Sequence, residues 1–130
     1  MSYRILIVDD SPGMRAVLQR VIDLSGIPVA ACLTACHGLA ALAILRNEPV
    51  DLILTDINMP EMNGEDLVAE LKKDPALSEI PVLVISTDAT SNRMQRMLEL
   101  GAAGYVIKPF QPETLRSEVE RVLGGVHVNG

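Results

Sequence analysis

Short runs of apolar residues, many of them β-branched, recur along the chain, and each is followed by a segment whose apolar residues have helical spacing. Such runs predict strands that are buried on both faces, and the helical spacing predicts helices with one buried face. The predicted strands cover residues 5–8, 28–35, 50–55, 82–86 and 104–107, and the predicted helices cover residues 12–24, 38–47, 64–73, 91–100 and 112–123.

Polar residues and glycines mark the ends of these elements. Ser11 can cap the first helix, and Pro12 is favoured at a first helical position. Gly26 and Gly101 follow the last apolar positions of two helices, where glycine commonly ends a helix. Thr90 or Ser91 is expected to cap the fourth helix.

The regular alternation of strand and helix predicts the fold class. Five such units with apolar strands predict a parallel sheet with helices on both faces. Right-handed crossovers then favour a doubly wound, flavodoxin-like, three-layer fold with strand order 2-1-3-4-5. We expect one domain over residues 1–123 and a flexible C-terminal tail over residues 124–130.

Composition narrows the class of protein. With only three aromatic residues, the core must be aliphatic, and the net charge of −6 argues against direct nucleic-acid binding. No apolar run has the length of a membrane span, and no signal peptide is recognisable, so we expect a cytoplasmic protein without membrane attachment. Cys32 and Cys36 are the only cysteines, and we expect both to be buried free thiols.

Polar side chains stand where four of the predicted strands end. Asp9 and Asp10 follow the first strand, Asp56 follows the third, Ser86 ends the fourth, and Lys108 follows the fifth. In the order 2-1-3-4-5 these groups converge on one edge of the sheet, where open α/β folds bind ligands.

This predicted cluster has the chemistry of a phosphoryl-transfer site. Three neighbouring carboxylates repel one another unless a cation offsets their charge, and oxygen ligands of this kind suit Mg²⁺. Lys108 can contact a phosphate oxygen, Ser86 can donate a hydrogen bond, and the Asp56 carboxylate can act as the nucleophile.

Each residue of the cluster also has an ordinary structural explanation. Asp10 could stabilise the N-terminus of the first helix, Ser86 could simply end a strand, and Lys108 could be a solvated surface charge. Asp56 could merely belong to the turn that follows its strand. Complementary chemistry at several independent strand ends favours the functional interpretation.

Four segments, IVDDS at 7–11, LTDINMP at 54–60 with Asn63-Gly64, IST at 85–87 and GYVIKPF at 104–110, share this edge. In order and spacing they resemble the signature segments of response-regulator receiver domains of two-component signalling, over about residues 4–123. The resemblance implies that Asp56 accepts a phosphoryl group, and that Asp9, Asp10, Asp56 and the Asn58 main-chain carbonyl hold Mg²⁺, or Mn²⁺ in its place.

The resemblance implies further roles at the same edge. Ser86 and Lys108 would contact the phosphoryl group, and the Lys108-Pro109 bond would be cis. A swing of Ser86 would leave space that Tyr105 can fill, which would make these two residues a switch. Asn58, Thr87 and Asp88 would tune dephosphorylation. The signalling surface on the fourth helix, fifth strand and fifth helix would include Arg93, Met94, Arg96, Met97 and Tyr105, although both methionines could equally be core residues.

The expected function is therefore phosphorelay signal transduction rather than enzymatic turnover of a substrate. The partners would be a sensor histidine kinase or a phosphotransfer protein, whose docking would use Met14, Arg15 and Leu18, and a downstream protein target. We expect a monomer or a weak dimer promoted by phosphorylation, acting as a single-domain regulator of chemotaxis type or as a phosphorelay shuttle.

Three alternatives stay open at this stage. The chain could be the receiver part of a longer regulator with a DNA-binding or enzymatic output domain. An aspartyl-nucleophile phosphatase would need a second acid two residues after Asp56, where Asn58 stands. A flavin-binding module would need a phosphate loop after the first strand, where Asp9 and Asp10 would repel the phosphate.

Overall fold

Five strands and five helices alternate along residues 2–126, which are the residues that the computed structural model describes. The strands are β1 (Tyr3–Val8), β2 (Val29–Ala35), β3 (Leu52–Thr55), β4 (Val82–Ser86) and β5 (Gly104–Ile107). The helices are α1 (Pro12–Leu24), α2 (Gly38–Asn47), α3 (Gly64–Lys73), α4 (Ser91–Leu100) and α5 (Pro112–Val126). The predicted alternation is confirmed, and four of the five helices have the predicted bounds.

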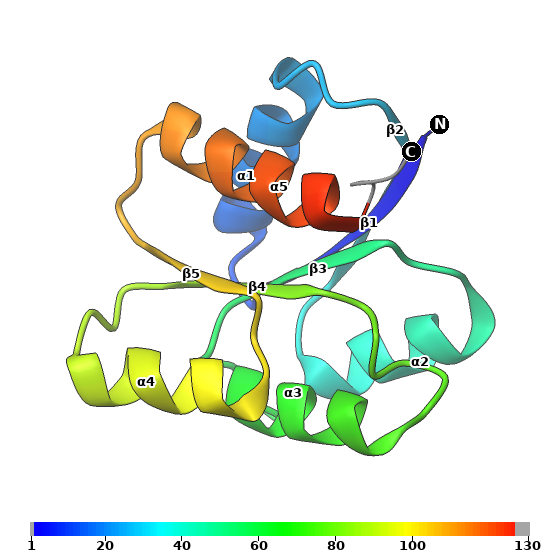
Figure 1. Ribbon diagram of the computed structural model, residues 1–130, viewed down its shortest axis with the longest axis vertical. Coiled ribbons are helices and arrows are strands. Elements are labelled where there is room, and N and C mark those ends of the chain that lie inside the picture. Colours follow the sequence, from blue (N-terminus) through cyan, green and yellow to red (C-terminus); the bar gives the residue numbers. More distant parts are fainter. Residues whose placement is uncertain (1, 127–130) are drawn as a thin grey trace.

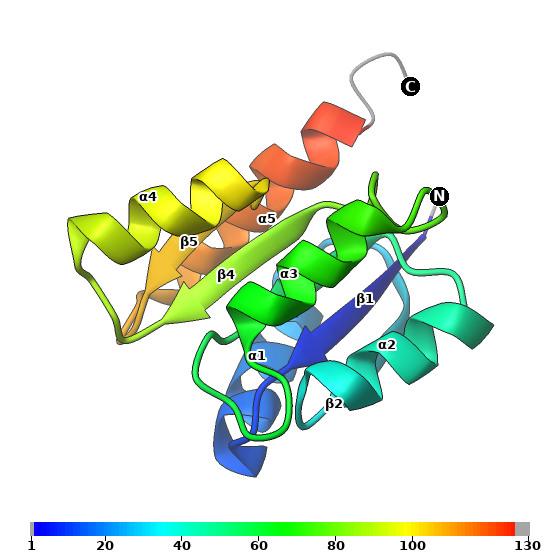
Figure 2. The same ribbon diagram turned by 90° about the horizontal axis from the view of Figure 1, so that it is seen from below.

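The strands form one parallel sheet in the order β2-β1-β3-β4-β5, as the sequence predicts. Val8 at the end of β1 pairs with Ala35 of β2 on one side and with Thr55 of β3 on the other. Ser86 at the end of β4 pairs with Ile107 of β5. Because the strands run in the same direction, their carboxyl ends lie at one edge of the sheet (Figure 2).

The helices cover both faces of the sheet in three layers (Figure 1). Helices α1 and α5 pack on one face through an aliphatic cluster that includes Leu18, Ile22 and Leu115. Helices α2, α3 and α4 pack on the other face through a second cluster that includes Leu67 and Met97. The strand residues alternate between the two clusters, which explains why the strands are apolar throughout.

Side-chain caps fix the starts of the helices that leave the functional edge. Ser11 accepts a hydrogen bond from the Met14 amide at 3.2 Å, and Thr90 accepts one from the Arg93 amide at 3.4 Å. Both caps satisfy backbone donors that the first helical turn leaves free. At the end of α4, Gly101 has a φ of 112°, a left-handed conformation that favours glycine.

The last helix is longer than predicted. It continues to Val126, so the first residues of the expected tail form its last turn, and residues 127–130 lie outside the described part of the chain. The two glycines at 124 and 125 are unfavourable in a helix and misled the sequence interpretation. The domain boundary at residue 123 stays a prediction.

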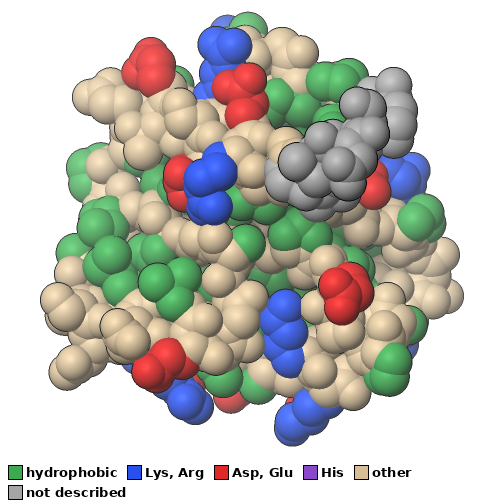
Figure 3. All heavy atoms as spheres, viewed as in Figure 1, with side chains coloured by type: hydrophobic (Ala, Val, Ile, Leu, Met, Phe, Trp, Pro, Cys, Tyr) green, Lys and Arg blue, Asp and Glu red, His purple; other side chains and the backbone are tan. Residues whose placement is uncertain are grey.

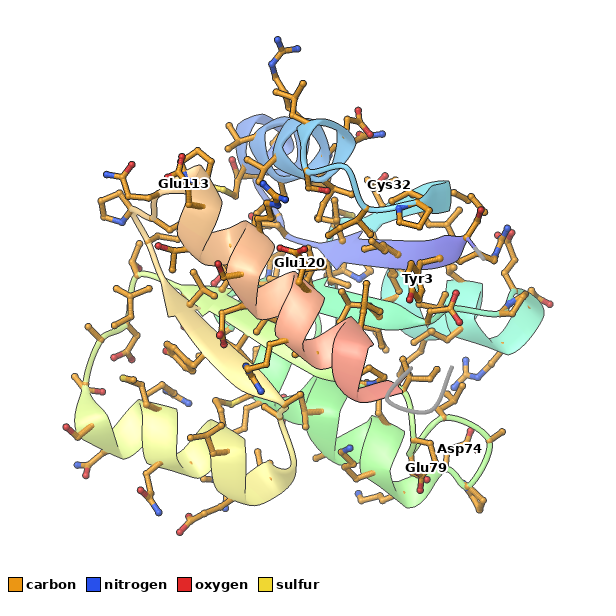
Figure 4. All side chains as sticks on the ribbon, turned by 45° about the horizontal axis from the view of Figure 1, so that its top comes forward. Tyr3, Cys32, Asp74, Glu79, Glu113 and Glu120 are labelled. Carbon is orange, nitrogen blue, oxygen red and sulfur yellow. The ribbon has the colours of Figure 1, made fainter. Side chains whose placement is uncertain are left out.

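The two cysteines are free, as expected, but their burial differs from the prediction. Cys32 lies half-buried on β2, next to the strand that carries Tyr3 (Figure 4). Cys36 is exposed because β2 ends at Ala35, one residue before it. Burial, reinforced by the nearby Asp23 carboxylate, raises the pKa of the Cys32 thiol to about 11.

The surface carries charges of both signs. On the face drawn in Figure 3, lysine and arginine side chains stand apart from one another and alternate with acidic ones. This face therefore offers no continuous basic stripe of the kind that nucleic-acid binding uses. Among the described residues, no helix combines the length and apolar character that crossing a bilayer requires.

Candidate functional site

Three carboxylates meet at the carboxyl edge of the sheet. Asp9 and Asp10 follow β1, and Asp56 follows β3, the strand that pairs with β1. One oxygen of each carboxylate lies within 4.8 Å of the others. Asp9 is buried at 1% exposure, whereas Asp10 is exposed, so the cluster extends from the core to the solvent. Oxygen donors at this spacing fit a hard divalent cation.

Lys108 connects the two more buried acids. Its Nζ lies 3.0 Å from Oδ2 of Asp9 and 3.2 Å from Oδ2 of Asp56. The Lys108 side chain is only 10% exposed, so water screens these ion pairs weakly. The sequence predicted a lysine that neighbours the acids, and the structure adds that one ammonium group bridges two of them. The Lys108-Pro109 bond that follows is cis, as the resemblance implied.

The Asp56 carboxylate is held in a defined orientation. Its Oδ1 accepts a hydrogen bond from the Ile57 amide at 2.7 Å, while Oδ2 faces Lys108. Its main-chain amide donates to the Val8 carbonyl at 2.9 Å, which ties the end of β3 to the end of β1. The Asp56 side chain is 12% exposed, so the carboxylate remains open to a reactant from solvent.

The backbone of Gly64 packs against the main chain of Asp56 and Ile57. Its amide donates to the Ile57 carbonyl at 2.8 Å, so α3 starts directly against the end of β3. A Cβ atom on Gly64 would lie 2.2 Å from the Asp56 carbonyl oxygen, which leaves no room for a side chain. Gly64 belongs to the signature segments, and its role follows only from this contact.

Asp9 is also fixed by the start of α1. Its Oδ1 accepts a hydrogen bond from the Ser11 amide at 2.9 Å, and its main-chain carbonyl accepts one from Arg15 at 2.7 Å. Arg15, which the sequence suggested only as a docking residue, therefore stabilises the loop that carries both acids. Its position one turn into α1 gave no signal of this contact.

The Ser86 side chain is fully buried at the end of β4. Its hydroxyl accepts a hydrogen bond from the Asp88 amide at 3.1 Å, and its carbonyl accepts one from the Lys108 amide at 2.8 Å. The phenol of Tyr105 donates to the Asp88 carbonyl, so Tyr105 points towards this loop. Burial chiefly raises the pKa of Tyr105, and the neighbouring Ser86 hydroxyl partly offsets this effect.

A group of charged side chains lies beside Asp88, between α3 and α4. Arg93 Nη1 lies 2.7 Å from Oε1 of Glu65, and Arg93 Nε lies 3.5 Å from Oδ2 of Asp88. Arg96 Nε approaches Oε2 of Glu65 at 3.4 Å. Both arginines are predicted residues of the signalling surface, but the pairing with Glu65 could not be predicted because Glu65 lies 28 residues before Arg93 and 31 before Arg96.

Two residues that were predicted to contact partners are buried, and for Met97 this confirms the alternative that it is a core residue. Met97 of α4 is fully buried in the core cluster between the sheet and helices α2, α3 and α4. Leu18 of α1 is 1% exposed and lies in the cluster on the other face of the sheet. Neither can contact a partner. The helical spacing of the methionines did not reveal which of them faces the sheet, whereas the structure leaves Met94 half-buried.

The other predicted residues surround the acids at the same edge or its rim. Asn58 is exposed in the loop after β3, and Thr87 is exposed in the loop after β4. Asp88 is half-buried next to Thr87, and the main-chain and side-chain hydrogen bonds from Thr90 chiefly lower its pKa. These positions are compatible with the predicted roles and do not test them.

Comparisons with known proteins agree with this geometry. A family model described as the response regulator receiver domain matches residues 5–120. The chain is 38% identical over 122 residues to the chemotaxis protein CheY1 of Helicobacter pylori, covering 93% of this chain and 97% of that protein. The structure resembles that of the chemotaxis response regulator CheY4 of Vibrio cholerae, with a TM-score of 0.84, 31% identity and coverage of 94% and 99%. It also resembles the phosphorylated cyanobacterial phytochrome response regulator RcpA, with a TM-score of 0.81, 28% identity and coverage of 95% and 93%.

Proposed function

Because the chain belongs to the response-regulator receiver family of two-component signalling, we propose that Asp56 accepts a phosphoryl group from a phosphohistidine. An Asp56 carboxylate oxygen attacks phosphorus, the P–N bond to the imidazole breaks, and the imidazole leaves with the electron pair of that bond and takes up a proton. The product is an aspartyl phosphate. The observation that carries this proposal is the held, solvent-accessible Asp56 carboxylate beside a buried ammonium group.

Residues of this chain offer a fitting site for a divalent cation. The carboxylates of Asp9, Asp10 and Asp56 present oxygen donors at suitable spacing, and we assign them, with the Asn58 main-chain carbonyl, as ligands of Mg²⁺, or of Mn²⁺ in its place. The cation, when bound, neutralises charge on the transferring phosphoryl group. Exposed Asp10 leaves one side of the cluster open to water and to a phosphoryl donor.

Lys108 and Ser86 act on the phosphoryl group in this proposal. Lys108 already faces Asp56 Oδ2 and can move its ammonium group to a phosphoryl oxygen without leaving the pocket. The Ser86 hydroxyl can turn from the Asp88 amide to donate to another oxygen. Such a turn changes the loop that carries the Tyr105 acceptor, so Ser86 and Tyr105 together report the state of Asp56.

The output is a change of partner affinity at α4, β5 and α5. Arg93, Met94, Arg96 and Tyr105 contribute to this signalling surface, while buried Met97 is removed from it. The phosphoryl donor is a sensor histidine kinase or a phosphotransfer protein, and the target is a protein in the cytoplasm. The relatives named for chemotaxis support a single-domain regulator of that type over a phosphorelay shuttle. The protein acts as a monomer or as a weak dimer promoted by phosphorylation.

The lifetime of the phosphoryl group is set by residues beside the path of water. Asn58, Thr87 and Asp88 occupy the two loops next to Asp56. Thr87 is exposed, so its methyl group can restrict the approach of water without being part of the core. Timing the hydrolysis of the aspartyl phosphate in Thr87→Ala measures this effect.

Mass spectrometry tests the central proposal directly. The intact protein is incubated with acetyl phosphate, with and without Mg²⁺, beside Asp56→Asn and the matched control Asp23→Asn, which removes an exposed carboxylate on α1. We expect one Mg²⁺-dependent phosphoryl adduct, labile to hydroxylamine, in the wild type and the control and none in Asp56→Asn. An adduct that persists in Asp56→Asn, or no adduct from either acetyl phosphate or a histidine-kinase donor, would refute the assignment.

A further inference from the structure

Tyr105 points into the loop between β4 and α4, where its phenol contacts the Asp88 carbonyl and lies beside the Ser86 hydroxyl. Its phenol donates a hydrogen bond to the carbonyl of Asp88, in the loop between β4 and α4. On β5 it pairs with Val84 of the neighbouring strand, so its backbone position is fixed by the sheet. The direction of the Tyr105 side chain therefore depends on where the loop holds the Asp88 carbonyl.

The hydrogen bonds within that loop are local. The Asp88 amide donates to Ser86, and Asp88 Oδ1 accepts from the Thr90 amide at 3.0 Å and the Thr90 hydroxyl at 2.7 Å. These bonds shape the turn and cap α4, but they connect residues only two positions apart. None of these three bonds connects the loop to α3, which lies beside α4 on the same face of the sheet.

Arg93 provides the connection across the surface. It stands in the first turn of α4, where one edge of its guanidinium faces Asp88 and the other faces Glu65. Glu65 follows Gly64, whose backbone packs directly against Asp56, so the main chain that carries Glu65 starts beside the phosphorylation site. The planar guanidinium can serve two carboxylates at once, which the point charge of a lysine cannot do in the same geometry.

Partial burial strengthens this group of three residues. The side chains of Arg93, Glu65 and Asp88 are 34%, 28% and 28% exposed, whereas those of the Arg116–Glu120 pair on α5 are 54% and 53% exposed. Arg96 also approaches Glu65, which keeps that carboxylate oriented towards α4. The group therefore spans from the start of α3 to the loop that holds Tyr105.

We propose that Glu65, Arg93 and Asp88 form a loop clamp in which Arg93 is the positioning residue that keeps Tyr105 in its inward position. The signalling meaning of the clamp rests on the proposed function, since it connects the Asp56 region to the surface of α4. A partner that contacts both Arg93 and Tyr105 would bind with an affinity that depends on the clamp. By linkage, its binding would change how often Tyr105 occupies the inward position.

The fluorescence of one tyrosine measures this position. The chain has no tryptophan and two tyrosines, so the variant Tyr3→Phe leaves Tyr105 as the reporter. In that background, quenching by acrylamide is compared for the parent, Arg93→Gln, Glu65→Gln, and Arg116→Gln as the control. Arg116 pairs with Glu120 on α5 and is far from the clamp.

We expect the quenching constant to rise about twofold in Arg93→Gln and Glu65→Gln, because Tyr105 then spends more time exposed. The double variant should equal either single one, since both break the same connection. Arg93→Lys should give an intermediate value, because a single Nζ cannot occupy both the Nη1 position beside Glu65 and the Nε position beside Asp88. Arg116→Gln should leave the constant unchanged.

Unchanged quenching in Arg93→Gln and Glu65→Gln, with the thermal midpoint of the parent retained, overturns the clamp. A rise in the Arg116→Gln control overturns it as well, because the effect would then be general. The measurement uses no phosphoryl donor, so it is independent of the adduct on Asp56. Raised quenching without any adduct would refute the proposed function alone, and a normal adduct with unchanged quenching would refute the clamp alone.

Discussion

The close contact between Gly64 and Asp56 makes a sharp prediction. In Gly64→Ala, the new Cβ would lie 2.2 Å from the Asp56 carbonyl oxygen and 2.9 Å from the Ile57 Cα atom. An ordinary contact between carbon and oxygen is about 3.3 Å, so the start of α3 and the end of β3 must separate by about 1 Å. Both contacting atoms belong to the backbone, which cannot turn away as a side chain could.

The expected cost combines two destabilising contributions and one stabilising contribution. Overpacking of this kind costs about 1–3 kcal/mol, and distortion of the hydrogen bond from the Gly64 amide to the Ile57 carbonyl adds about 1 kcal/mol. Alanine recovers about 0.5–1 kcal/mol because it restricts the unfolded chain. We expect a net loss of about 1–3.5 kcal/mol in the free energy of unfolding, and a value near the middle, about 2 kcal/mol, lowers the thermal midpoint by about 8 °C.

The assay is urea unfolding followed by circular dichroism, beside the control Gly13→Ala. Gly13 lies in the first turn of α1, where a Cβ would meet only the Ser11 hydroxyl at 3.8 Å. The control should therefore be as stable as the wild type or gain up to about 0.5 kcal/mol. The steric argument is wrong if both variants unfold at the same urea concentration as the wild type.

Four further measurements concern Cys32, the cap of α4 and the ion pairs of Lys108. In a Cys36→Ser background, Cys32 should react with a disulfide reagent at pH 8 about a hundredfold more slowly when folded than in guanidinium, because its pKa is raised from 9.0 to about 11. Because the folded thiol holds its proton more tightly than the unfolded one, its contribution to the free energy of unfolding is complete below pH 9 and is lost as the pH rises towards 11. In thermal melts between pH 9 and 11, Cys32→Ala should therefore lose less stability than the wild type. Thr90→Ala should lose about 1 kcal/mol in urea unfolding because it removes the cap of α4. Without Mg²⁺, Lys108→Met should lose about 3 kcal/mol in the free energy of unfolding, because two buried carboxylates lose their cation. When Mg²⁺ is added, its thermal midpoint should rise more than that of the wild type. The control Lys73→Met, at an exposed lysine, should match the wild type in both measurements.

The order of elements and the site edge could be predicted because both follow from local patterns. Apolar runs locate the strands, caps and glycines locate the helix ends, and the parallel order brings the residues after β1, β3, β4 and β5 to one edge. The acids at positions 9, 10 and 56 therefore meet as expected. Their pairing with Lys108 could only be suggested, because it joins residues 52 and 99 positions apart.

Other features could not be predicted because they depend on how elements face one another. Met94 and Met97 are three positions apart on α4, and this spacing allows either residue to belong to the buried face of the helix. Of the two, Met97 is the one that is fully buried in the core. Glu65 and Arg93 pair because α3 and α4 lie side by side on the same face of the sheet. No pattern in either helix alone contains that information.

Charge balance at the sheet edge links the structure to the proposed chemistry. Three carboxylates face one ammonium group there, which leaves two formal negative charges when all four groups are ionised. Conversion of the Asp56 carboxylate to an acyl phosphate replaces one negative charge by about two, so the site becomes still more negative. A bound dication would offset the charge of the resting site and most of the charge of the phosphorylated one. The yield of the phosphoryl adduct should therefore depend more steeply on the Mg²⁺ concentration than the free energy of unfolding does. The fold depends less on Mg²⁺ because the Lys108 ammonium already pairs with both Asp9 and Asp56.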